Sequence, residues 1–329
     1  MSDAHERLTL VDVGTDDATD DLADAVRSGL EATPKSLPCR FFYDEEGSRI
    51  FEEICETPEY YPTRAEHSIL ERYAESIAGR FPSATDLVEL GSGSSTKTRV
   101  LIEAFLHRHA RLRYLPVDIS RTMLEESALA LLDDYDGLEI RAIAAEYADG
   151  LARIEREQPR RRLVLWLGSN VGNFSREAAA RFVARVRDAI GEEDRFLIGI
   201  DLRKDAKVLE AAYDDAGGVT ARFNKNVLVR INRELDGDFD VDAFEHRATY
   251  HRDAGTVSMH LVSSVRQRVA VGALDATFDF DAGEAIHTED SVKYSPDEID
   301  TLARAGGFDV ETFWEDDDHC FRVSLFAPR

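Results

Sequence analysis

An acid followed by two closely spaced glycines is the part of this sequence with the clearest chemistry. An apolar run ends at Glu89-Leu90, and Gly91 and Gly93 follow before a helical pattern begins. A strand, tight turn and helix of this kind let the backbone approach a nucleotide-like ligand closely. Thr96 replaces the third glycine of a dinucleotide fingerprint, and the sequence lacks the Gly-Lys-Ser/Thr of a P-loop. What remains is a glycine turn typical of S-adenosylmethionine (SAM) sites.

A second acid, Asp118, ends the next apolar run, about 25 residues beyond the glycines. A carboxylate at the tip of a second strand can accept hydrogen bonds from both hydroxyls of a ribose. Asp118 can also be a turn residue or a helix N-cap, a position for which Ser120 competes. The order of strand, glycine turn, strand and acid favours the ribose interpretation.

The elements that must position these residues alternate between strands and helices. The predicted strands are residues 86–90, 113–117, 138–144, 162–167 and 195–201. Helical patterns lie between them, for instance at residues 176–190, where apolar residues recur every three or four positions. This alternation predicts an α/β fold in which a parallel sheet carries helices on both faces.

The alternation stops after Asp201 for about ninety residues and then resumes. A helix start at Ser295-Pro296 leads to a stop at Gly306-Gly307, and two strands follow at residues 308–314 and 320–326. A final helix with a strand pair closes the sheet of a class I methyltransferase, whose last strand is antiparallel. We therefore predict a class I SAM-methyltransferase (Rossmann-like) core, formed by residues 65–203 and 293–329.

The remaining segments are predicted to form a second domain. Residues 34–64 are too apolar and aromatic for a tail, and residues 204–292 interrupt the core. We expect these two pieces to build a substrate-binding domain over the carboxyl edge of the sheet, although they can also be separate structural additions. Residues 1–33 read as an acidic N-terminal segment that can be partly disordered.

Composition excludes several classes of protein. The chain has 329 residues, 40 basic against 65 acidic, and a formal net charge of -25, which argues against nucleic acid as a partner. It shows neither a signal peptide nor an apolar run long enough to span a membrane. Three cysteines without ligand spacing suggest a reducing cytoplasm, and the scattered histidines predict no metal site. We expect a cytoplasmic monomer.

Several further motifs resemble one family. From about Lys35 onward the chain is similar to the histidine Nα-methyltransferases of ergothioneine biosynthesis, which use SAM to trimethylate L-histidine to hercynine. The matching motifs are Phe-Tyr-Asp-x-x-Gly-Ser (42–48), Glu-Tyr-Tyr-Pro-Thr-Arg (59–64), Glu-Leu-Gly-Ser-Gly (89–93), Gly-x-x-x-Gly-Asn (168–173), Ala-Tyr-Asp-Asp (212–215), Phe-Asn-x-Asn-Val-Leu (223–228), Asn-Arg-Glu-Leu (232–235) and Thr-Glu-x-Ser-x-Lys (288–293). Motifs in this order over more than 250 residues are far more specific than one glycine turn.

The resemblance implies a SAM site with one role for each residue. Gly91 admits the ligand to the backbone, Lys97 meets the methionyl carboxylate, and Asp118 holds the ribose. Glu146 and Tyr147 contact the adenine, although the family usually has aspartate and phenylalanine there. Read without the family, Lys97 is a solvated lysine on a helix. The cofactor is converted to S-adenosylhomocysteine (SAH).

The resemblance also implies a site for L-histidine and its mono- and dimethyl intermediates. The implied residues are Tyr60, Gly168, Asn173, Tyr213, Met259, Glu289 and Ser291. Asn173 and Tyr213 supply donors to the substrate carboxylate, Glu289 and Ser291 face the imidazole nitrogens, and Met259 packs against the ring. Judged singly, the tyrosines and Met259 read as core residues and Glu289 as a solvated acid.

The implied reaction is direct in-line methyl transfer, with Tyr43, Tyr60 and Asn173 as the catalytic residues. Tyr43 or Tyr60 can accept the amine proton through water, but loss of the proton to solvent is equally compatible. Aromatic faces favour the quaternary ammonium product. Ser169-Asn170-Val171 replaces the family's usual glycine-threonine-isoleucine, which can alter the loop around Gly168.

Three other functions stay open at this point. The acceptor can be another aromatic amino acid such as tryptophan, although an indole would clash with Glu289. The chain can also be a non-catalytic SAM-binding protein, in which Asn173 or Tyr60 would have been lost. An NAD-dependent oxidoreductase is disfavoured by Thr96.

Overall fold

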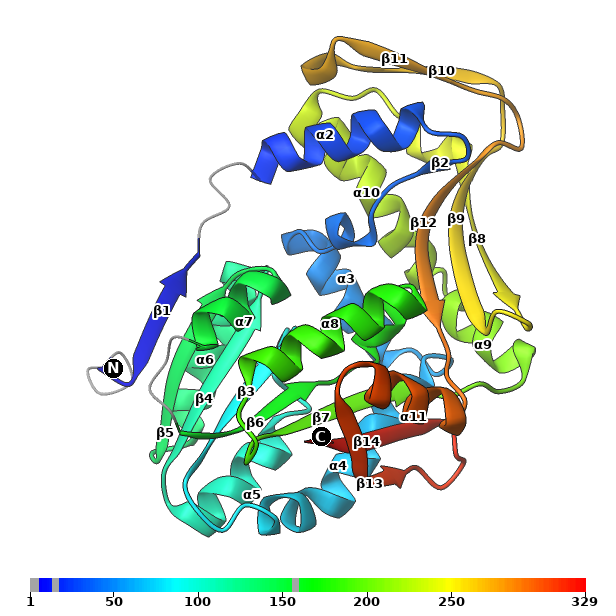
Figure 1. Cartoon of the computed structure of the whole chain (residues 1–329). Helices are drawn as coiled ribbons and strands as arrows, with labels where there is room; N and C mark the ends of the chain where they lie inside the picture. The colour runs from blue at the N-terminus through cyan, green and yellow to red at the C-terminus, as the bar shows by residue number, and fades with distance from the viewer. Residues whose placement is uncertain (1–5, 14–17, 156–159) are drawn as a thin grey trace. The chain divides into compact units, whose positions relative to one another are not determined.

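The chain divides into two compact units in a computed structural model that describes residues 6–13, 18–155 and 160–329 (Figure 1). Unit 1 contains the N-terminal strand, Pro62–Arg203 and Lys293–Arg329. Unit 2 contains two segments, one that ends at Tyr61 and one that covers Lys204–Val292. Each unit has its own apolar core, so each is described separately.

Unit 1 is built on one large sheet in the order β1-β5-β4-β3-β6-β7-β14-β13. Its strands are β1 (Leu8–Asp12), β3 (Thr85–Leu90), β4 (Leu112–Asp118), β5 (Leu138–Ala144), β6 (Arg161–Trp166), β7 (Arg195–Asp201), β13 (Phe308–Glu315) and β14 (Phe321–Pro328). All neighbours are parallel except β14, which runs antiparallel to both β7 and β13. This confirms the predicted α/β fold of a class I methyltransferase.

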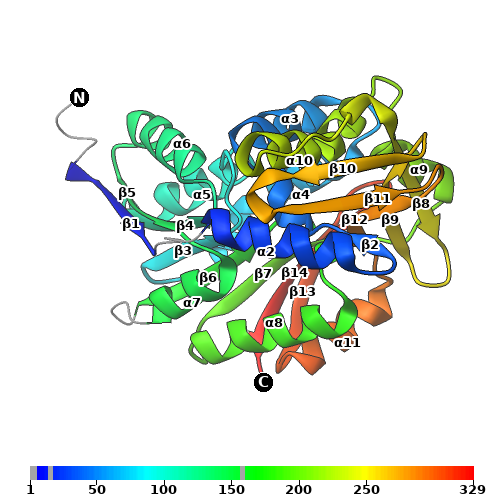
Figure 2. The same cartoon turned by 90° about the horizontal axis from the view of Figure 1, so that it is seen from above.

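Helices cover both faces of this sheet (Figure 2). On one face lie α4 (Tyr61–Gly79), α5 (Arg99–His109) and α6 (Arg121–Asp134), and on the other lie α7 (Tyr147–Glu155), α8 (Arg176–Ala189) and α11 (Pro296–Ala305). Because both faces are covered, the central strands are largely buried; every residue of β3 is buried, including Asp86 and Glu89. The carboxyl ends of β3, β4, β5 and β6 therefore meet at one edge, where ligands of open α/β sheets bind.

The last helix begins at a strong sequence signal. Ser295 accepts a hydrogen bond from the N–H of Glu298, whose side chain accepts one from the N–H of Ser295, and Pro296 occupies the first turn. This capping box satisfies two of the N–H groups that every helix start leaves unpaired. It explains why the sequence located α11 so closely.

A buried ion pair marks the place where the chain leaves unit 1 and returns to it. Lys293 Nζ lies 2.8 Å from a carboxylate oxygen of Asp201, and both side chains are fully buried. Backbone hydrogen bonds run beside the pair, from Tyr294 N–H to Asp201 O and from Arg203 N–H to Tyr294 O. Arg203 also forms a two-pronged ion pair with Glu298 of α11. The two ends of the inserted segment are therefore tied together.

The N-terminal segment has more structure than its acidic composition suggested. β1 pairs in parallel with β5 over five residues, and α2 (Ala18–Glu31) contributes Leu22, Val26 and Leu30 to the core of unit 2. Leu8 and Leu10 alternate in β1, and Leu22, Val26 and Leu30 recur every four residues in α2, so a pattern was present within a segment whose overall composition is acidic. Residues 1–5 and 14–17 of the same predicted segment lie outside the described residues.

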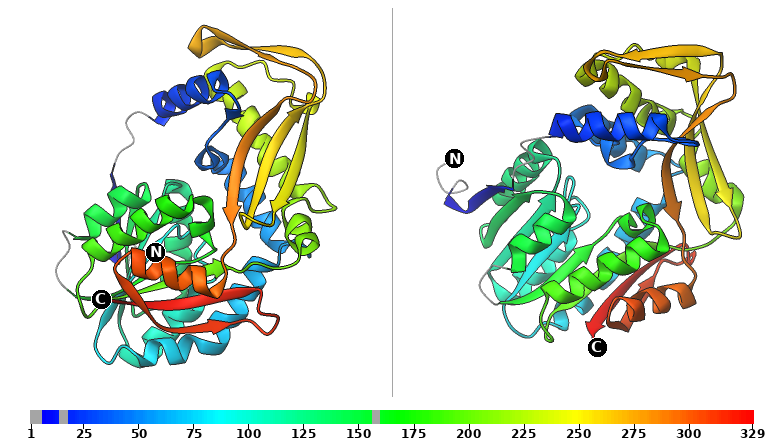
Figure 3. Two further views of the ribbon diagram at one scale, coloured as in Figure 1. Left: turned by 45° about the vertical axis from the view of Figure 1, so that its right-hand side comes forward. Right: turned by 45° about the horizontal axis from the view of Figure 1, so that its top comes forward.

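Unit 2 combines a curved sheet with helices. The sheet has the order β2-β12-β9-β8, and its long strands are drawn in yellow and orange in Figure 3. The elements are β2 (Lys35–Ser36), η1 (Cys39–Phe42), α3 (Glu45–Glu56), α9 (Ala206–Tyr213), α10 (Val219–Leu235), η3 (Val241–Ala243), β8 (Phe244–His251), β9 (Thr256–Ser263), β10 (Gln267–Val271), η4 (Gly272–Leu274), β11 (Ala276–Phe280) and β12 (Ala285–Val292). β10 and β11 form a separate hairpin.

Candidate functional site

Gly91 lies directly after β3, where the backbone must turn sharply. Its φ is +73°, and a Cβ at this position would stand 2.7 Å from the hydroxyl of Tyr147 and 3.0 Å from the amide nitrogen of Asn170. A side chain would therefore be both strained and obstructed. The turn brings the end of β3, the start of α7 and the loop after β6 into contact, which fits the close approach of a nucleoside ligand.

Asp118 at the end of β4 holds this turn. Its carboxylate accepts hydrogen bonds from the N–H of Gly93 at 2.8 Å and of Ser120 at 2.9 Å. Burial raises the pKa of Asp118 above its ordinary value, although backbone N–H groups pull it down. Ser120 is the N-cap of α6, so Asp118 is a turn residue and not the cap. Its binding to ribose stays a prediction.

Glu146 and Tyr147 follow β5 but differ in their surroundings. Glu146 is exposed, whereas the ring of Tyr147 packs edge-on against Trp166 and lies near Phe174 and Phe182. The aromatic group fixes the Tyr147 hydroxyl beside Gly91. An adenine contact by these two residues remains a prediction.

Lys97 is not the solvated lysine that its isolated position suggested. Its ammonium lies 2.5 Å from the carboxylate of Glu66, a completely buried residue of α4. The same carboxylate accepts the N–H of Gly168 at 2.8 and 2.9 Å to its two oxygens. Glu66 thus joins the glycine turn to the loop after β6, and no motif in the sequence singled it out.

The loop after β6 carries Gly168 and Asn173. Gly168 and Ser169 both have positive φ, +74° and +57°, and η2 (Asn170–Asn173) follows. Ser169 stands where the family usually has glycine, and its hydroxyl accepts the N–H of Asp201 at 2.9 Å. The loop keeps a left-handed backbone at this serine, because a buried hydrogen bond offsets the strain.

A second group of predicted residues gathers within unit 2. The rings of Tyr60 and Tyr213 meet edge to face at 6.2 Å, and the hydroxyls of Tyr213 and Ser291 lie 2.8 Å apart. Tyr60 is buried, which raises its pKa well above the ordinary value; Tyr213, Cys55, Tyr43 and Glu289 add to this in smaller measure. Tyr60 therefore keeps its proton and acts as a phenol, not as a phenolate.

A β-bulge in β12 brings Glu289 to the same side as Met259. His287 pairs with His260 and Glu289 pairs with Met259, so Thr288 is an extra residue, and its hydroxyl donates to Met259 O. If β12 paired regularly, Thr288 would lie opposite Met259, and Glu289 would lie opposite Ser258 on the face of the sheet that carries His287. The bulge thus places an acid and the Ser291 hydroxyl on the face where Met259 lies.

The backbone carbonyl of Tyr213 is bound by a histidine whose side chain is buried. The Nε2 of His246 lies 2.8 Å from Tyr213 O, and the amide nitrogen of Asn224 lies 2.8 Å from His246 Nδ1. Burial lowers the pKa of His246, so the ring is neutral; its Nε2–H donates to the carbonyl and its Nδ1 accepts from the amide. The sequence gave no sign of this role for His246.

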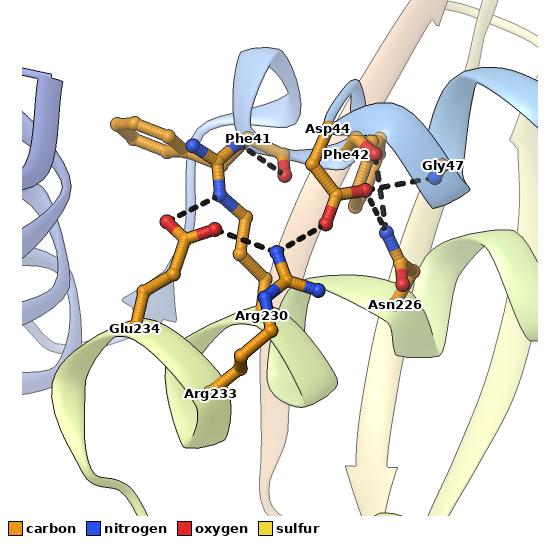
Figure 4. Close-up of polar contacts among 8 residues, drawn as sticks. All are labelled: Phe41, Phe42, Asp44, Gly47, Asn226, Arg230, Arg233 and Glu234. Carbon is orange, nitrogen blue, oxygen red and sulfur yellow. Dashed lines mark hydrogen bonds and ion pairs between the residues drawn. The ribbon is translucent and has the colours of Figure 1, made fainter.

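The turn that presents Tyr43 rests on a polar network (Figure 4). Asp44 accepts hydrogen bonds from Gly47 N–H, from the Asn226 amide at 2.7 Å and from Arg233 at 2.6 Å. Burial alone would raise the pKa of Asp44, but these bonds hold it below the ordinary value. The Tyr43 ring itself packs against Phe51 and Phe223. Three of the motifs, 42–48, 223–228 and 232–235, are therefore joined by one hydrogen-bond network within unit 2.

Gly47 of the same turn cannot be replaced without rearrangement. A Cβ at Gly47 would stand 1.7 Å from Phe42 O and 2.9 Å from the Asn226 amide nitrogen. The glycine is therefore required by the close approach of α3 to the turn.

Neither metal binding nor a membrane span is indicated by the described part of the chain. Residues 6–13, 18–155 and 160–329 contain no group of three His, Cys, Asp or Glu side chains that would hold a metal ion. None of the helices in those ranges is both long and apolar enough to cross a bilayer.

Comparison with known proteins identifies the family. The family described as "Histidine-specific methyltransferase, SAM-dependent" matches residues 22–328, nearly the whole chain. The chain belongs to this family.

Among related proteins, this member of the family is 45% identical to the histidine N-alpha-methyltransferase of Mycobacterium tuberculosis, over 92% of this chain and 93% of that protein. It is 42% identical to the histidine N-alpha-methyltransferase of Mycolicibacterium smegmatis, over 95% of this chain and 97% of that protein. Ergothioneine biosynthesis protein 1 of Schizosaccharomyces pombe is 29% identical over 85% of this chain, which spans 37% of that longer protein. Membership confirms the resemblance and the use of SAM as methyl donor.

Glu66, Asn170 and His246 contact predicted site residues, namely Gly168, Gly91 and Tyr213, and were not among the residues predicted from the sequence. Glu66 falls at the buried spacing of α4, which also includes Pro62, Ile69 and Leu70. An acid at an apolar helical position is rarely buried unless paired, so this spacing was a usable signal. The contact of Asn170 with Gly91 depends on the loop's path and left no comparable signal.

The first prediction concerns Glu89, which lies beneath the glycine turn. Thr98 and Tyr114 donate hydrogen bonds to its carboxylate, yet burial raises its pKa to about 7 from an ordinary 4.5. Above pH 4.5 the unfolded chain loses this proton while the folded chain keeps it. The contribution of Glu89 to the free energy of unfolding should therefore fall by about 3 kcal/mol between pH 4.5 and 7.

Glu89→Gln cannot ionise, so its urea-unfolding free energy should fall less than that of the wild type over this pH range. Glu125→Gln removes an exposed charge from α6 and serves as the control. Parallel curves for the wild type and Glu89→Gln would contradict the assignment.

The second prediction concerns the turn that presents Tyr43. Asn226→Ala removes the donors to Phe42 O and Asp44 from a buried site. We expect the free energy of unfolding in urea to fall by about 1–3 kcal/mol, since buried acceptors lose their partners. Arg233→Ala, whose side chain is half exposed, should cost less. Equal losses for both variants would show that the buried amide has no special weight.

Proposed function

We propose that this methyltransferase transfers methyl groups from SAM to the α-amino group of L-histidine three times, giving hercynine for ergothioneine biosynthesis. Its relatives at 45% and 42% identity carry the name histidine N-alpha-methyltransferase. The observation that carries the proposal is the group formed by Glu289, the Tyr213–Ser291 hydroxyl pair and Met259 within unit 2. An acid and a hydroxyl on one face suit the two nitrogens of an imidazole.

The residues divide into two roles. In unit 1, Gly91, Lys97, Asp118, Glu146 and Tyr147 would hold SAM, whose sulfonium supplies the reactive methyl group. Gly168 and Asn173 would orient the amine, while Tyr60, Tyr213, Met259, Glu289 and Ser291 would bind the amino acid. The fit of a nucleoside to this chain is supported by the Gly91 turn, where no side chain can be accommodated.

In-line transfer needs positioning more than acid–base chemistry. Fixing two reactants in a productive geometry supplies roughly 7–11 kcal/mol of the barrier. Because burial keeps Tyr60 protonated, we assign it as a hydrogen-bond donor and an aromatic face, and we assign loss of the amine proton to water. The Tyr43 and Tyr60 rings would stabilise the growing cation.

A substrate survey tests the proposal. Purified protein is incubated with SAM and an equimolar mixture of the twenty amino acids, and the products are analysed by mass spectrometry. We expect histidine alone to gain methyl groups, up to three. Methylation of a different amino acid would overturn the proposed substrate, and SAM binding without any methylation would favour a non-catalytic role.

Glu289 is the residue that should decide between histidine and a larger aromatic substrate. Glu289→Ala removes a charged hydrogen-bond acceptor, which should lower kcat/KM for histidine about 10- to 100-fold. The ratio of tryptophan to histidine turnover should rise at the same time. Glu289→Gln keeps an acceptor oxygen and should lose less. An unchanged substrate ratio in Glu289→Ala would remove Glu289 from the imidazole site.

A further inference from the structure

We propose that Glu66 is a positioning residue that fixes Lys97 for the methionyl carboxylate and anchors the loop of Gly168. None of the SAM-binding, substrate-binding or catalytic roles proposed above was assigned to Glu66. The inference rests on the proposed function in one respect, because Lys97 is taken to meet the carboxylate of SAM.

The burial of Glu66 shows that its charge must be compensated within unit 1. The side chain is fully buried on α4, and its carboxylate receives Lys97 Nζ at 2.5 Å and the Gly168 N–H at 2.8 and 2.9 Å. A buried carboxylate is tolerated only when it is paired and hydrogen-bonded. Lys97 and Gly168 are therefore held to Glu66 by the cost of leaving its carboxylate without partners.

The surrounding backbone leaves space for this arrangement. Gly199 of β7 lies against Glu66, since a Cβ on Gly199 would stand 1.9 Å from a Glu66 carboxylate oxygen. A Cβ on Gly168 would stand 3.4 Å from Lys97 Nζ. The absence of a side chain at Gly199 therefore leaves room for the Glu66 carboxylate, and Gly168, on the loop after β6, lies beside the ammonium of Lys97.

The chemistry of the pair gives Glu66 a specific task. Lys97 is only one quarter exposed at its side chain, so its ammonium has limited freedom. A lysine alone is a flexible point charge on a four-carbon stem, whereas the bond to Glu66 fixes where that charge sits. The bond to Gly168 N–H simultaneously orients the loop that carries Asn173. One carboxylate therefore fixes both the Lys97 ammonium, which would meet the carboxylate of SAM, and the loop of Gly168 and Asn173, which would orient the substrate amine.

Binding of two related ligands tests the first part of this proposal. SAH carries the amino-acid carboxylate, whereas 5′-methylthioadenosine lacks it. Glu66→Gln removes the negative charge and one of the two acceptor oxygens, while the remaining oxygen can still accept from the Gly168 N–H. The ammonium of Lys97 then has only a neutral acceptor at this position and is held less firmly. We expect calorimetry to show SAH binding weakened at least tenfold, with binding of 5′-methylthioadenosine unchanged within twofold.

The variants Lys97→Met and Glu66→Gln/Lys97→Met complete the cycle. If Glu66 acts through Lys97, the double variant should bind SAH no more weakly than Lys97→Met alone. Should Lys97→Met fail to fold, the double variant, which leaves no buried charge unpaired, is compared directly with Glu66→Gln. Unchanged or tighter SAH binding in Glu66→Gln overturns the proposal. So does a double variant whose loss of SAH affinity is the product of the two single losses, or a loss of 5′-methylthioadenosine affinity equal to that of SAH.

Asp86→Asn is the matched control. Asp86 is also buried and paired, with Arg113, but it lies at the amino end of β3, opposite the ligand edge. This variant should lower the thermal midpoint while leaving SAH binding within twofold. A loss of SAH binding here like that of Glu66→Gln would reduce Glu66 to a general structural role and overturn the proposal.

Glu66→Met tests the loop as well as the cation. It removes the acceptor for Gly168 N–H, so we expect it to lose SAH affinity as Glu66→Gln does and also to lower kcat for histidine methylation at saturating SAM at least tenfold below that of Glu66→Gln. Equal kcat in these two variants would overturn the anchoring of the loop. SAH binding can be measured without any methyl-accepting substrate. Absence of histidine methylation in the wild type would therefore count against the proposed function and not against the role of Glu66.

Discussion

The buried ion pair of Asp201 and Lys293 is the constraint on which the organisation of this chain depends. An insertion of residues 204–292 separates β7 from the helix and strands that complete the sheet. Removing two charges from water is costly unless they meet each other in good geometry. The pair therefore forms only when both ends of the insertion come together, and this closure allows β14 to pair with β7 from Phe321 opposite Asp201.

The same principle recurs along the ligand edge of unit 1. Glu66, Glu89 and Asp118 are acids of a strongly acidic chain that are turned inward, and each is held by specific donors. Together they fix Lys97, the Thr98 hydroxyl and the Gly93 amide, which all belong to the glycine turn or its continuation. Negative charge thus serves two purposes in this protein: most acids keep the surface solvated, and a few hold the backbone that faces the cofactor.

Unit 2 gains its chemistry from register and from packing. The single extra residue Thr288 decides which side of the sheet Glu289 faces, and the neutral ring of His246 holds Tyr213 by its carbonyl. Aromatic side chains close the group, with Tyr43, Phe51 and Phe223 in mutual contact. These devices explain why motifs far apart in the sequence, 42–48, 223–228 and 232–235, are needed together.

The sequence by itself determined the α/β alternation, the glycine turn after β3 and the start of α11, since each depends on a local pattern of residue types. The order of its motifs along the chain also predicted the methyltransferase family. It missed β1 and α2, because the acids of this segment dominate its composition, although Leu8 and Leu10 alternate and Leu22, Val26 and Leu30 recur at helical spacing. The tertiary structure alone decided that Lys97 pairs with Glu66, that Asp118 holds the glycine turn while Ser120 caps the helix, and that a bulge turns Glu289 towards Met259. The reason is physical: these contacts join residues from separate elements, and their partners are chosen by burial and register, which no local spacing encodes.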